Sequence, residues 1–256
     1  MYNKKMLTNF YEDLTSSEIK RINKKTVLIF PFSSIEQHGS HLPINTDKKI
    51  LEGILSKFNN KFASNKYLIM PQIYIGSANE HKSFDGTISL NSVDFIQYSI
   101  KIIEQLCEKK FTNIFLLNSH GGQISHLDII GKELKAKYNI TIVKGTYFLF
   151  DDFKEIISRK EKDYGYHGGE FETSLMLYLY PELVKLNKFT SYEYSTDLKS
   201  KKIISLKKKI KKSWLTEEIS KTGIIGNPIK SNKEKGRKIV AKVINYINKI
   251  VNELYN

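Results

Sequence analysis

Four residues that can bind a metal ion or transfer a proton lie close together near the start of the chain. They are Glu36, His38, His41 and Asp47, within the segment 30–47, FPFSSIEQHGSHLPINTD. In an extended backbone the side chains at positions i and i+2 point to the same side, so Glu36 and His38 are expected to project together. Carboxylate and imidazole ligands in combination suit Zn, Mn or Fe(II) better than Ca or Mg. The segment therefore predicts a metal site, although Asp47 alone also fits the N-cap of a following helix.

The element expected to position these residues is a buried strand directly before them. Residues 26–32, TVLIFPF, are a short apolar run with β-branched and aromatic side chains, which is typical of a strand inside a parallel sheet. After Asp47, apolar residues recur at helical spacing and predict a helix over residues 48–60. A strand, a loop with the polar residues and then a helix is the order found in α/β proteins.

A second segment with a histidine follows another predicted strand. Residues 111–117 form the strand, and the segment 118–123, NSHGGQ, comes directly after it. Because ligands bind at the carboxyl ends of parallel strands, His120 is expected at the same sheet edge as Glu36 and His38. A phosphate-binding loop is a weak alternative, because the chain has neither GxGxxG nor GxxxxGK[ST].

A third segment combines a histidine with two acidic residues. In residues 164–176, YGYHGGEFETSLM, His167 precedes a Gly-Gly pair, and Glu170 and Glu172 fall in the first turns of a predicted helix. Acidic residues near a helix N-terminus also have an ordinary explanation, because they interact favourably with the helix dipole. A histidine placed directly before the glycines makes a role in the same site the more specific interpretation.

The remaining pattern predicts an α/β fold with one domain spanning residues 1–256. Helices are expected over residues 10–24, 93–110, 124–134 and 233–254, and further strands over residues 67–75 and 140–150. Asn91 or Ser92 is expected to cap the helix over residues 93–110. Cys107 falls on the apolar side of that helix, so we expect a buried core residue rather than a nucleophile. As the only cysteine, it has no partner for a disulfide within the chain.

Composition limits the possible partners and locations. The 256-residue chain carries a net charge of +14, but only three of its 41 basic residues are arginine, the side chain that phosphate and base recognition favours. We therefore expect no nucleic-acid partner. Residues 201–212, KKIISLKKKIKK, are expected to be a solvated face, with a basic amphipathic helix as the alternative. The chain shows neither a signal peptide nor an apolar run long enough to cross a bilayer, so we expect a cytoplasmic protein without a membrane partner.

Four segments together resemble the creatininase family of metal-dependent amidohydrolases. They are SSIEQHGSHLPINTD (33–47), FDGTISL (84–90), NSHGGQ (118–123) and HGGEFETSLMLYLYPELV (167–184), in the family's order and spacing. The resemblance implies a three-layer α/β/α fold with a largely parallel central sheet and assembly into a homo-oligomer, commonly a hexamer.

The resemblance also implies a site with two divalent metal ions, Zn, Mn or Fe(II). Asp47 would bridge the ions, Glu36 and His38 would each bind one of them, and His120 would complete the protein ligands of one ion. His167 matches the proton shuttle of the family. The substrate-lining candidates are His81, Tyr164 and Tyr166.

The chain departs from the creatinine-hydrolysing branch of the family at three positions. Gly122 stands where that branch has a metal-binding Glu, and Glu170 stands where the branch has an apolar residue. We therefore expect Glu170 to supply the fifth ligand, with Glu172 as the alternative. Asp163 replaces a tryptophan that closes over creatinine, and the only tryptophan, Trp214, lies far away in the sequence. Creatinine itself is thus an unexpected substrate.

Three functions are compatible with these residues. The first is a dinuclear amidohydrolase in which a hydroxide between the ions attacks a small lactam, amide or formamide. The second uses the same site as a peptidase that matures a small modified peptide. The third is a non-catalytic basic binding protein with a structural metal site, which the carboxylate-rich ligand set disfavours because structural zinc sites are usually closed by Cys and His.

Overall fold

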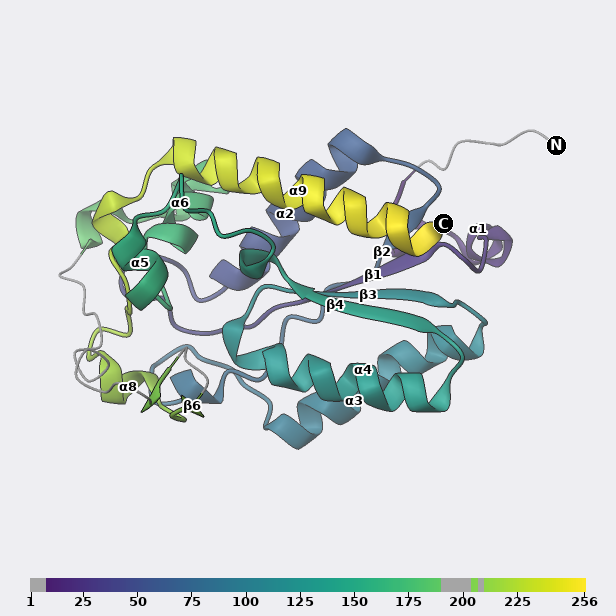
Figure 1. Cartoon of the computed structure of the whole chain (residues 1–256), viewed down its shortest axis with the longest axis horizontal. Helices are drawn as coiled ribbons and strands as arrows, with labels where there is room; N and C mark the ends of the chain where they lie inside the picture. Colours follow the sequence, from purple (N-terminus) through teal and green to yellow (C-terminus); the bar gives the residue numbers. More distant parts are fainter. Residues whose placement is uncertain (1–7, 190–203, 207–209) are drawn as a thin grey trace.

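A parallel sheet forms the centre of the molecule in the computed structural model, which describes residues 8–189, 204–206 and 210–256. Its four strands follow the order β2-β1-β3-β4 and are β1 (Val27–Phe32), β2 (Tyr67–Ile69), β3 (Asn113–Asn118) and β4 (Thr141–Thr146). β1 and β3 are buried along their whole length because they lie in the middle of the sheet with helices over both faces (Figure 1). The parallel sheet expected from the sequence is confirmed.

Helices cover both faces of this sheet and make the three layers. One layer contains α2 (Thr46–Phe62), α6 (Glu170–Leu179) and α9 (Lys233–Tyr255), and the other contains α3 (Ser92–Glu108) and α4 (Ile124–Lys137) (Figure 1). Alternate residues of β1 contribute to the two cores, with Ile29 on the α2 side and Leu28 on the α3 side. The expected α/β/α architecture is confirmed. Cys107 is a free, buried residue of α3, as expected.

The described residues contain further short elements. They are α1 (Ser16–Arg21), α5 (Arg159–Tyr164), α8 (Thr216–Ile219), the strand pair β5 (Ile204–Ser205) and β6 (Ile210–Lys211), and the 3-10 turns η1 (Tyr11–Asp13), η2 (Asn79–His81), η3 (Gly121–Gln123), η4 (Tyr147–Leu149), η5 (Pro181–Leu183), η6 (Leu186–Lys188) and η7 (Pro228–Lys230). The helix considered for residues 201–212 lies partly outside the described residues. Where the structure describes this segment, it forms the two short paired strands β5 and β6.

Three predicted elements differ from the observed ones for local reasons. The helix expected over residues 10–24 is divided, because Thr15 forms a capping box with Glu18 and starts α1 as a separate helix. The strand expected over residues 67–75 ends at Ile69, close to Pro71, which lacks the N–H that a sheet needs. The strand expected over residues 140–150 ends at Thr146, where the turn η4 begins.

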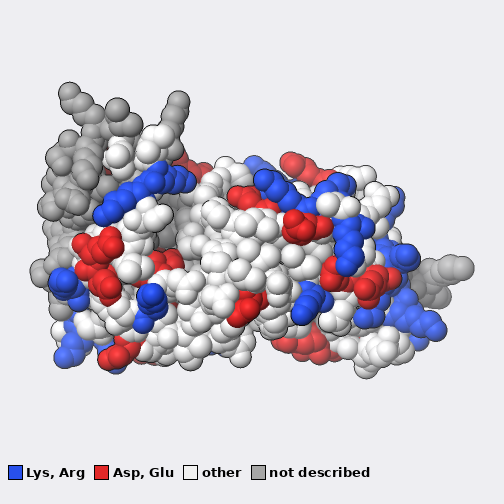
Figure 2. Space-filling view, turned by 90° about the horizontal axis from the view of Figure 1, so that it is seen from below, with Lys and Arg blue, Asp and Glu red and all other residues white. Residues whose placement is uncertain are grey.

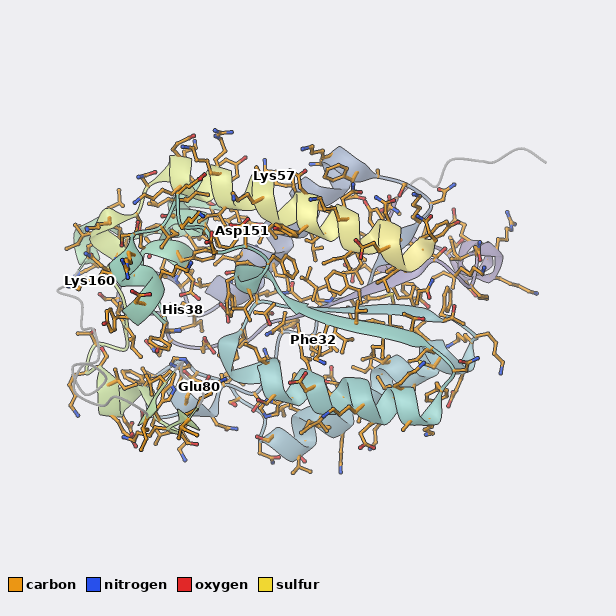
Figure 3. All side chains as sticks on the ribbon, viewed as in Figure 1. Phe32, His38, Lys57, Glu80, Asp151 and Lys160 are labelled. Atoms are coloured by element: carbon orange, nitrogen blue, oxygen red, sulfur yellow. The ribbon has the colours of Figure 1, made fainter. Side chains whose placement is uncertain are left out.

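The strand register brings the two main polar segments to one edge. Phe32, the last residue of β1, pairs with Asn118, the last residue of β3, so the loops after both strands begin side by side. Figure 3 shows His38 and Glu80 beyond this end of the sheet, whereas Phe32 lies at the strand itself. The polar loops after β1 and β3 therefore lie together at the carboxyl edge of the sheet, where the site is expected.

Basic and acidic side chains are mixed on the face of the molecule that Figure 2 shows. On the face that Figure 2 shows, Lys and Arg side chains are interspersed with acidic ones around a central area without charges. Searching the described part of the chain for a membrane-spanning helix yields none of sufficient length and apolar character. The net charge of +14 is thus not gathered into one basic stripe on this face.

Candidate metal centre

Glu36, Asp47 and His120 form a buried group at the carboxyl edge of the sheet. The Nδ1 atom of His120 lies 3.0 Å from Glu36 Oε2 and 3.3 Å from Asp47 Oδ2. All three side chains are almost completely excluded from solvent. Their ligand atoms lie within 4.8 Å of one another, the spacing expected of residues that share a metal ion.

The local structure holds each of these side chains from a different direction. Glu36 follows β1, and its backbone N–H donates to the Ile44 carbonyl across the loop. Asp47 is the second residue of α2, and its Oδ2 accepts a hydrogen bond of 2.7 Å from Ser34 Oγ. His120 follows β3, where the Asn118 side chain accepts from its backbone N–H at 3.1 Å. Two strand ends and one helix start thus converge on the group.

His38 and Glu172 extend the group on the opposite side of Asp47. The Nε2 atom of His38 lies 3.5 Å from Asp47 Oδ1 and 3.9 Å from Glu172 Oε2. The Nδ1 atom of His38 is 3.1 Å from the Glu36 carbonyl, and because a carbonyl only accepts, Nδ1 carries the hydrogen. Nε2 is therefore free of hydrogen in the neutral ring and faces the carboxylates. A backbone partner that fixes the tautomer in this way is typical of metal-binding histidines.

Unpartnered atoms in this group fit a bound metal ion. Glu36 Oε2, His38 Nε2 and Asp47 Oδ1 are completely buried and have no hydrogen-bond partner. Buried polar atoms are rarely left in this state, because an unmet hydrogen bond costs about 1–3 kcal/mol. All three are oxygen or nitrogen atoms that bind divalent cations of the Zn, Mn or Fe(II) type. The donor set is thus suited to metal, with Asp47 facing both parts of the group.

Burial and charge give this group unusual proton affinities. Burial raises the pKa of Glu36 and raises the pKa of Glu172 to about 7. Burial also acts to raise the pKa of Asp47, but the neighbouring imidazoles of His120 and His38 lower it overall. For His38 burial acts to lower the pKa, and Asp47, Glu172 and Glu36 together raise it to about 9. In the metal-free site, protons therefore occupy positions that a cation would take.

His167 lies against the group through its ring. Its Nδ1 is 3.6 Å from Glu36 Oε1, and its ring centroid is 4.2 Å from that of His38. Its Nε2 is hydrogen-bonded to the Gln37 carbonyl, which only accepts, so Nε2 carries the hydrogen. Burial lowers the pKa of His167 well below its ordinary value, and His38 adds to this effect. The neutral ring therefore presents a bare Nδ1 to the site.

The structure does not bring Glu170 to the group, which corrects the expectation that it is the fifth ligand. Its carboxylate is bound to Lys235 Nζ and accepts from Ser158 Oγ at 2.7 Å. Glu172 faces His38 instead and accepts from the Gly168 N–H at 2.6 Å. The two residues are about 200° apart around the helix, so only one of them can face the site. His41 also stays outside the described metal-binding groups and pairs with Thr173 at 2.9 Å.

Other residues of the site lie outside the proposed ligand set, and among them His81 and Tyr166 are substrate-lining candidates expected from the sequence. Glu80 Oε1 lies 3.2 Å from His120 Nε2, and His81 Nε2 lies 3.7 Å from Glu36 Oε1. The segment 214–225 covers the same region, with Thr216 against His81 at 2.9 Å and Trp214 edge-on to Tyr166. Trp214 thus lies near the site in space although it is distant in sequence. A polar segment of this kind carries no periodicity, so only the folded chain places it.

The fold and the site together define an α/β protein with a buried metal-binding centre at the carboxyl edge of its sheet. The family model described as creatinine amidohydrolase matches residues 12–251, and the chain belongs to the creatininase family. It is accordingly a metal-dependent hydrolase that acts on C–N bonds. The family resemblance seen in the sequence is confirmed.

The chain is similar to relatives whose names describe different activities. Creatinine amidohydrolase of Pseudomonas putida is 28% identical over 66% of this chain and 70% of its own length. Mycofactocin precursor peptide peptidase of Mycolicibacterium smegmatis is 23% identical over 86% of this chain and 81% of its own.

Among solved structures, a mutant creatininase of Zn–Zn type has a TM-score of 0.78 and is 24% identical. The match covers 97% of this chain and 98% of that chain. A creatininase with Mn has a TM-score of 0.74 at 22% identity, over 96% and 98% of the chains. These structures share the fold, and the prediction of divalent metal as cofactor agrees with them and with the buried groups found here.

Proposed function

We propose that the protein is a dinuclear metal-dependent amidohydrolase that cleaves a C–N bond of a small lactam, amide or formamide. The observation that carries this proposal is the arrangement of unpartnered buried atoms on both sides of Asp47. Its Oδ1 faces His38 and its Oδ2 faces His120, which supports a bridging role between two ions. A carboxylate-rich set of this kind suits catalysis better than a closed structural site.

The ligands of the two ions follow from the two sides of the group. Glu36, Asp47 and His120 would hold one ion, and His38, Asp47 and Glu172 would hold the other. Glu172 takes the role first expected of Glu170. When bound, two divalent ions polarise a carbonyl oxygen and lower the pKa of water toward about 7. The protein holds the ligand atoms in place, because Glu36, His38, Asp47 and His120 are buried and Glu172 is only partly exposed.

His167 would move the proton during the reaction. Its bare Nδ1 faces the site next to Glu36, and its Nε2–H is fixed by the Gln37 carbonyl. A neutral imidazole in this orientation accepts a proton from the attacking water and then donates it to the leaving nitrogen. The hydrogen bond to Gln37 keeps the ring from turning over between the two steps. His167→Ala is expected to retain the metal ions and to lose turnover.

A peptidase is the second candidate function, and one specific observation favours it. The mycofactocin precursor peptide peptidases align with 85–90% of this chain, against 66% for the creatinine amidohydrolase of Pseudomonas putida. The substrate would then be a short peptide bound by the same ions and the same His167. Creatinine remains an unexpected substrate, because Asp163 stands at the position where the creatinine-hydrolysing branch has a tryptophan that closes over the substrate.

A mass-spectrometric screen of the zinc- or manganese-loaded protein tests both functions, with Asp47→Ala as the blank. The panel contains creatinine and other lactams, formamido-pyrimidines and short peptides. Metal-dependent cleavage of a lactam or formamide supports the first function, and cleavage of a peptide supports the second. If nothing is cleaved and no metal is retained, the hypothesis of a basic binding protein replaces both. We also propose a cytoplasmic homo-oligomer, a hexamer by family resemblance; light scattering of the purified protein tests the oligomeric state.

A further inference from the structure

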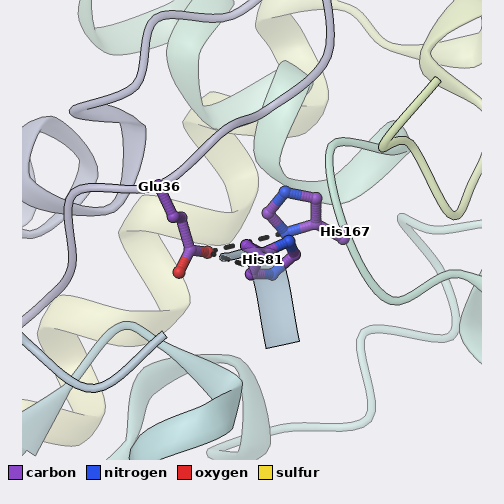
Figure 4. A group of neighbouring side chains, drawn as sticks. All are labelled: Glu36, His81 and His167. Carbon is purple, nitrogen blue, oxygen red and sulfur yellow. Dashed lines mark ion pairs between the residues drawn. The ribbon is translucent and has the colours of Figure 1, made fainter. Parts of the chain in front are cut away.

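His81 faces the candidate metal centre but has no part in the proposed ligand set. It ends the short turn η2 and is buried. Its Nε2 lies 3.7 Å from Glu36 Oε1, and its ring lies 4.1 Å from the ring of His167 (Figure 4). Its position allows two roles, a further metal ligand or a hydrogen-bond donor. Which ring nitrogen carries the hydrogen decides between them.

The amide of Gln37 has a fixed orientation, and this determines the answer. Gln37 Oε1 accepts from the Gly39 N–H at 2.9 Å, and Gln37 Nε2 donates to the Gly223 carbonyl at 3.0 Å. An N–H only donates and a carbonyl only accepts, so turning the amide over would break both hydrogen bonds. The NH₂ group of Gln37 is therefore the end that faces His81.

The second hydrogen of that NH₂ group is directed at His81. Gln37 Nε2 lies 2.9 Å from His81 Nδ1, so Nδ1 must be the acceptor and carries no hydrogen. The Thr216 hydroxyl lies 2.9 Å from the same nitrogen and can rotate to donate as well. In the neutral ring the hydrogen then resides on Nε2. This is the nitrogen that faces Glu36.

His38 and His81 differ in this respect although both face the same carboxylates. The Nδ1 of His38 meets a carbonyl, an acceptor, which in the neutral ring leaves its Nε2 bare for a metal ion. The Nδ1 of His81 meets an amide NH₂, a donor, which leaves the hydrogen on Nε2. A nitrogen that carries a hydrogen has no lone pair for a cation. The distance of 3.7 Å to Glu36 Oε1 exceeds a hydrogen bond, so Glu36 does not engage this N–H.

We propose that His81 is a further catalytic residue, a fixed neutral donor whose Nε2–H hydrogen-bonds the substrate's carbonyl oxygen as negative charge develops on it. The proposal rests on the proposed amidohydrolase function. No proton is transferred from His81 during the reaction, and Gln37 acts as the positioning residue that holds the tautomer. Glu36 Oε1 marks the point on which the N–H of His81 and the bare Nδ1 of His167 converge (Figure 4). A donor and a proton acceptor thus face the same small volume, as hydrolysis of a C–N bond requires.

The test is ¹⁵N NMR of the protein labelled at histidine, in which protonated and bare ring nitrogens resonate far apart. The His81 signals are assigned by their loss in His81→Gln, and His126→Gln is the matched control. We expect a bare Nδ1 and a protonated Nε2 in the metal-free protein, unchanged after zinc is added. A bare Nε2, or an Nε2 that loses its hydrogen on zinc binding, would make His81 a ligand and overturn the proposal.

Two further measurements complete the test. Gln37→Glu replaces the donor with an acceptor, so the hydrogen of His81 should move to Nδ1; an unchanged tautomer would contradict the positioning role. Acetate, a carboxylate probe for the zinc-loaded protein, should shift the Nε2–H proton of His81 and slow its exchange. Acetate that perturbs His167 but leaves this proton unchanged would refute the donor role. Failure of the parent protein to bind zinc would count against the proposed function instead, since the tautomer is read without metal.

Discussion

Glu170 and Glu172 stand two residues apart at the start of α6, and their carboxylates point in opposite directions. Glu170 contacts Lys235 and Ser158, whereas Glu172 faces His38 across the candidate metal centre. The Glu170 carboxylate therefore links α6 to the start of α9 through an ion pair, and the Glu172 carboxylate contributes to the site. The segment HGGEFETS thus holds a structural acid and a functional acid in one helical turn.

This division predicts different results for two matched substitutions. Glu172→Gln should bind one zinc ion per chain in place of two, with little loss of stability, because the amide is a poorer cation ligand. Glu170→Gln should keep both ions and lower the free energy of unfolding by about 1–3 kcal/mol, since a charged hydrogen-bonded pair is broken. Metal analysis after gel filtration, together with urea unfolding, measures both effects. Loss of an ion in Glu170→Gln alone would restore the first assignment.

Asp47 should be required for both ions, because its two oxygens face different groups. Asp47→Ala is expected to retain neither zinc ion, whereas loss of a ligand from one side should cost a single ion. Asp151→Ala is the control, because Asp151 pairs with Lys242 outside the site and should leave two ions in place. Mass spectrometry of the native protein counts the ions directly. Two ions bound to Asp47→Ala would rule out the bridging role.

Zinc binding should release protons and strengthen as the pH rises. In the metal-free protein the pKa of His38 is raised to about 9 and that of Glu172 to about 7. Both groups must be bare to bind metal, so below these values protons compete with the cation and affinity falls. Affinity should therefore rise with pH across the range in which these groups lose their protons. Calorimetric titration in two buffers with different ionisation enthalpies counts the protons; a count near zero at about pH 7 contradicts this model.

Much of the fold and part of the site follow from sequence pattern alone. The runs before Glu36 and His120 are short and apolar, so they predict strands, and the carboxyl edge of a parallel sheet then brings both residues together. The pattern does not separate Glu170 from Glu172, because both fall in one helical turn and only the tertiary contact with Lys235 distinguishes them. Thr216 and Trp214 reach the site from a polar segment without periodicity, which sequence alone leaves unplaced.

Glu80 should strengthen metal binding without contacting the metal. Its Oε1 lies 3.2 Å from His120 Nε2, while His120 Nδ1 faces Glu36 and Asp47. A carboxylate on the outer nitrogen of a ligand histidine fixes the ring and raises its basicity, and its removal typically weakens metal affinity by about 10–100-fold. Glu80→Gln should show a loss of this size in competition with a zinc chelator. The control is Glu104→Gln, which alters only the contacts of Glu104 with Lys137 and the Tyr138 hydroxyl, outside the site. Equal affinities for Glu80→Gln and the parent would show that Glu80 does not support His120.

Gly122 should be required for full zinc affinity, because the Glu80 side chain occupies the space next to it. A Cβ atom at this position would lie 2.0 Å from Glu80 Oε1 and 2.6 Å from His120 Nε2, closer than any real contact. Gly122→Ala is therefore expected to displace the Glu80 carboxylate and to weaken zinc binding at least as much as Glu80→Gln. The double variant should add little to Gly122→Ala, because that change alone already removes the contact between Glu80 and His120. Gly131→Ala is the matched control, since a Cβ there meets no atom within 4 Å inside α4 and should stabilise the helix by about 0.5–1 kcal/mol. Losses of affinity that add fully in the double variant would show that Gly122 acts on the site independently of Glu80.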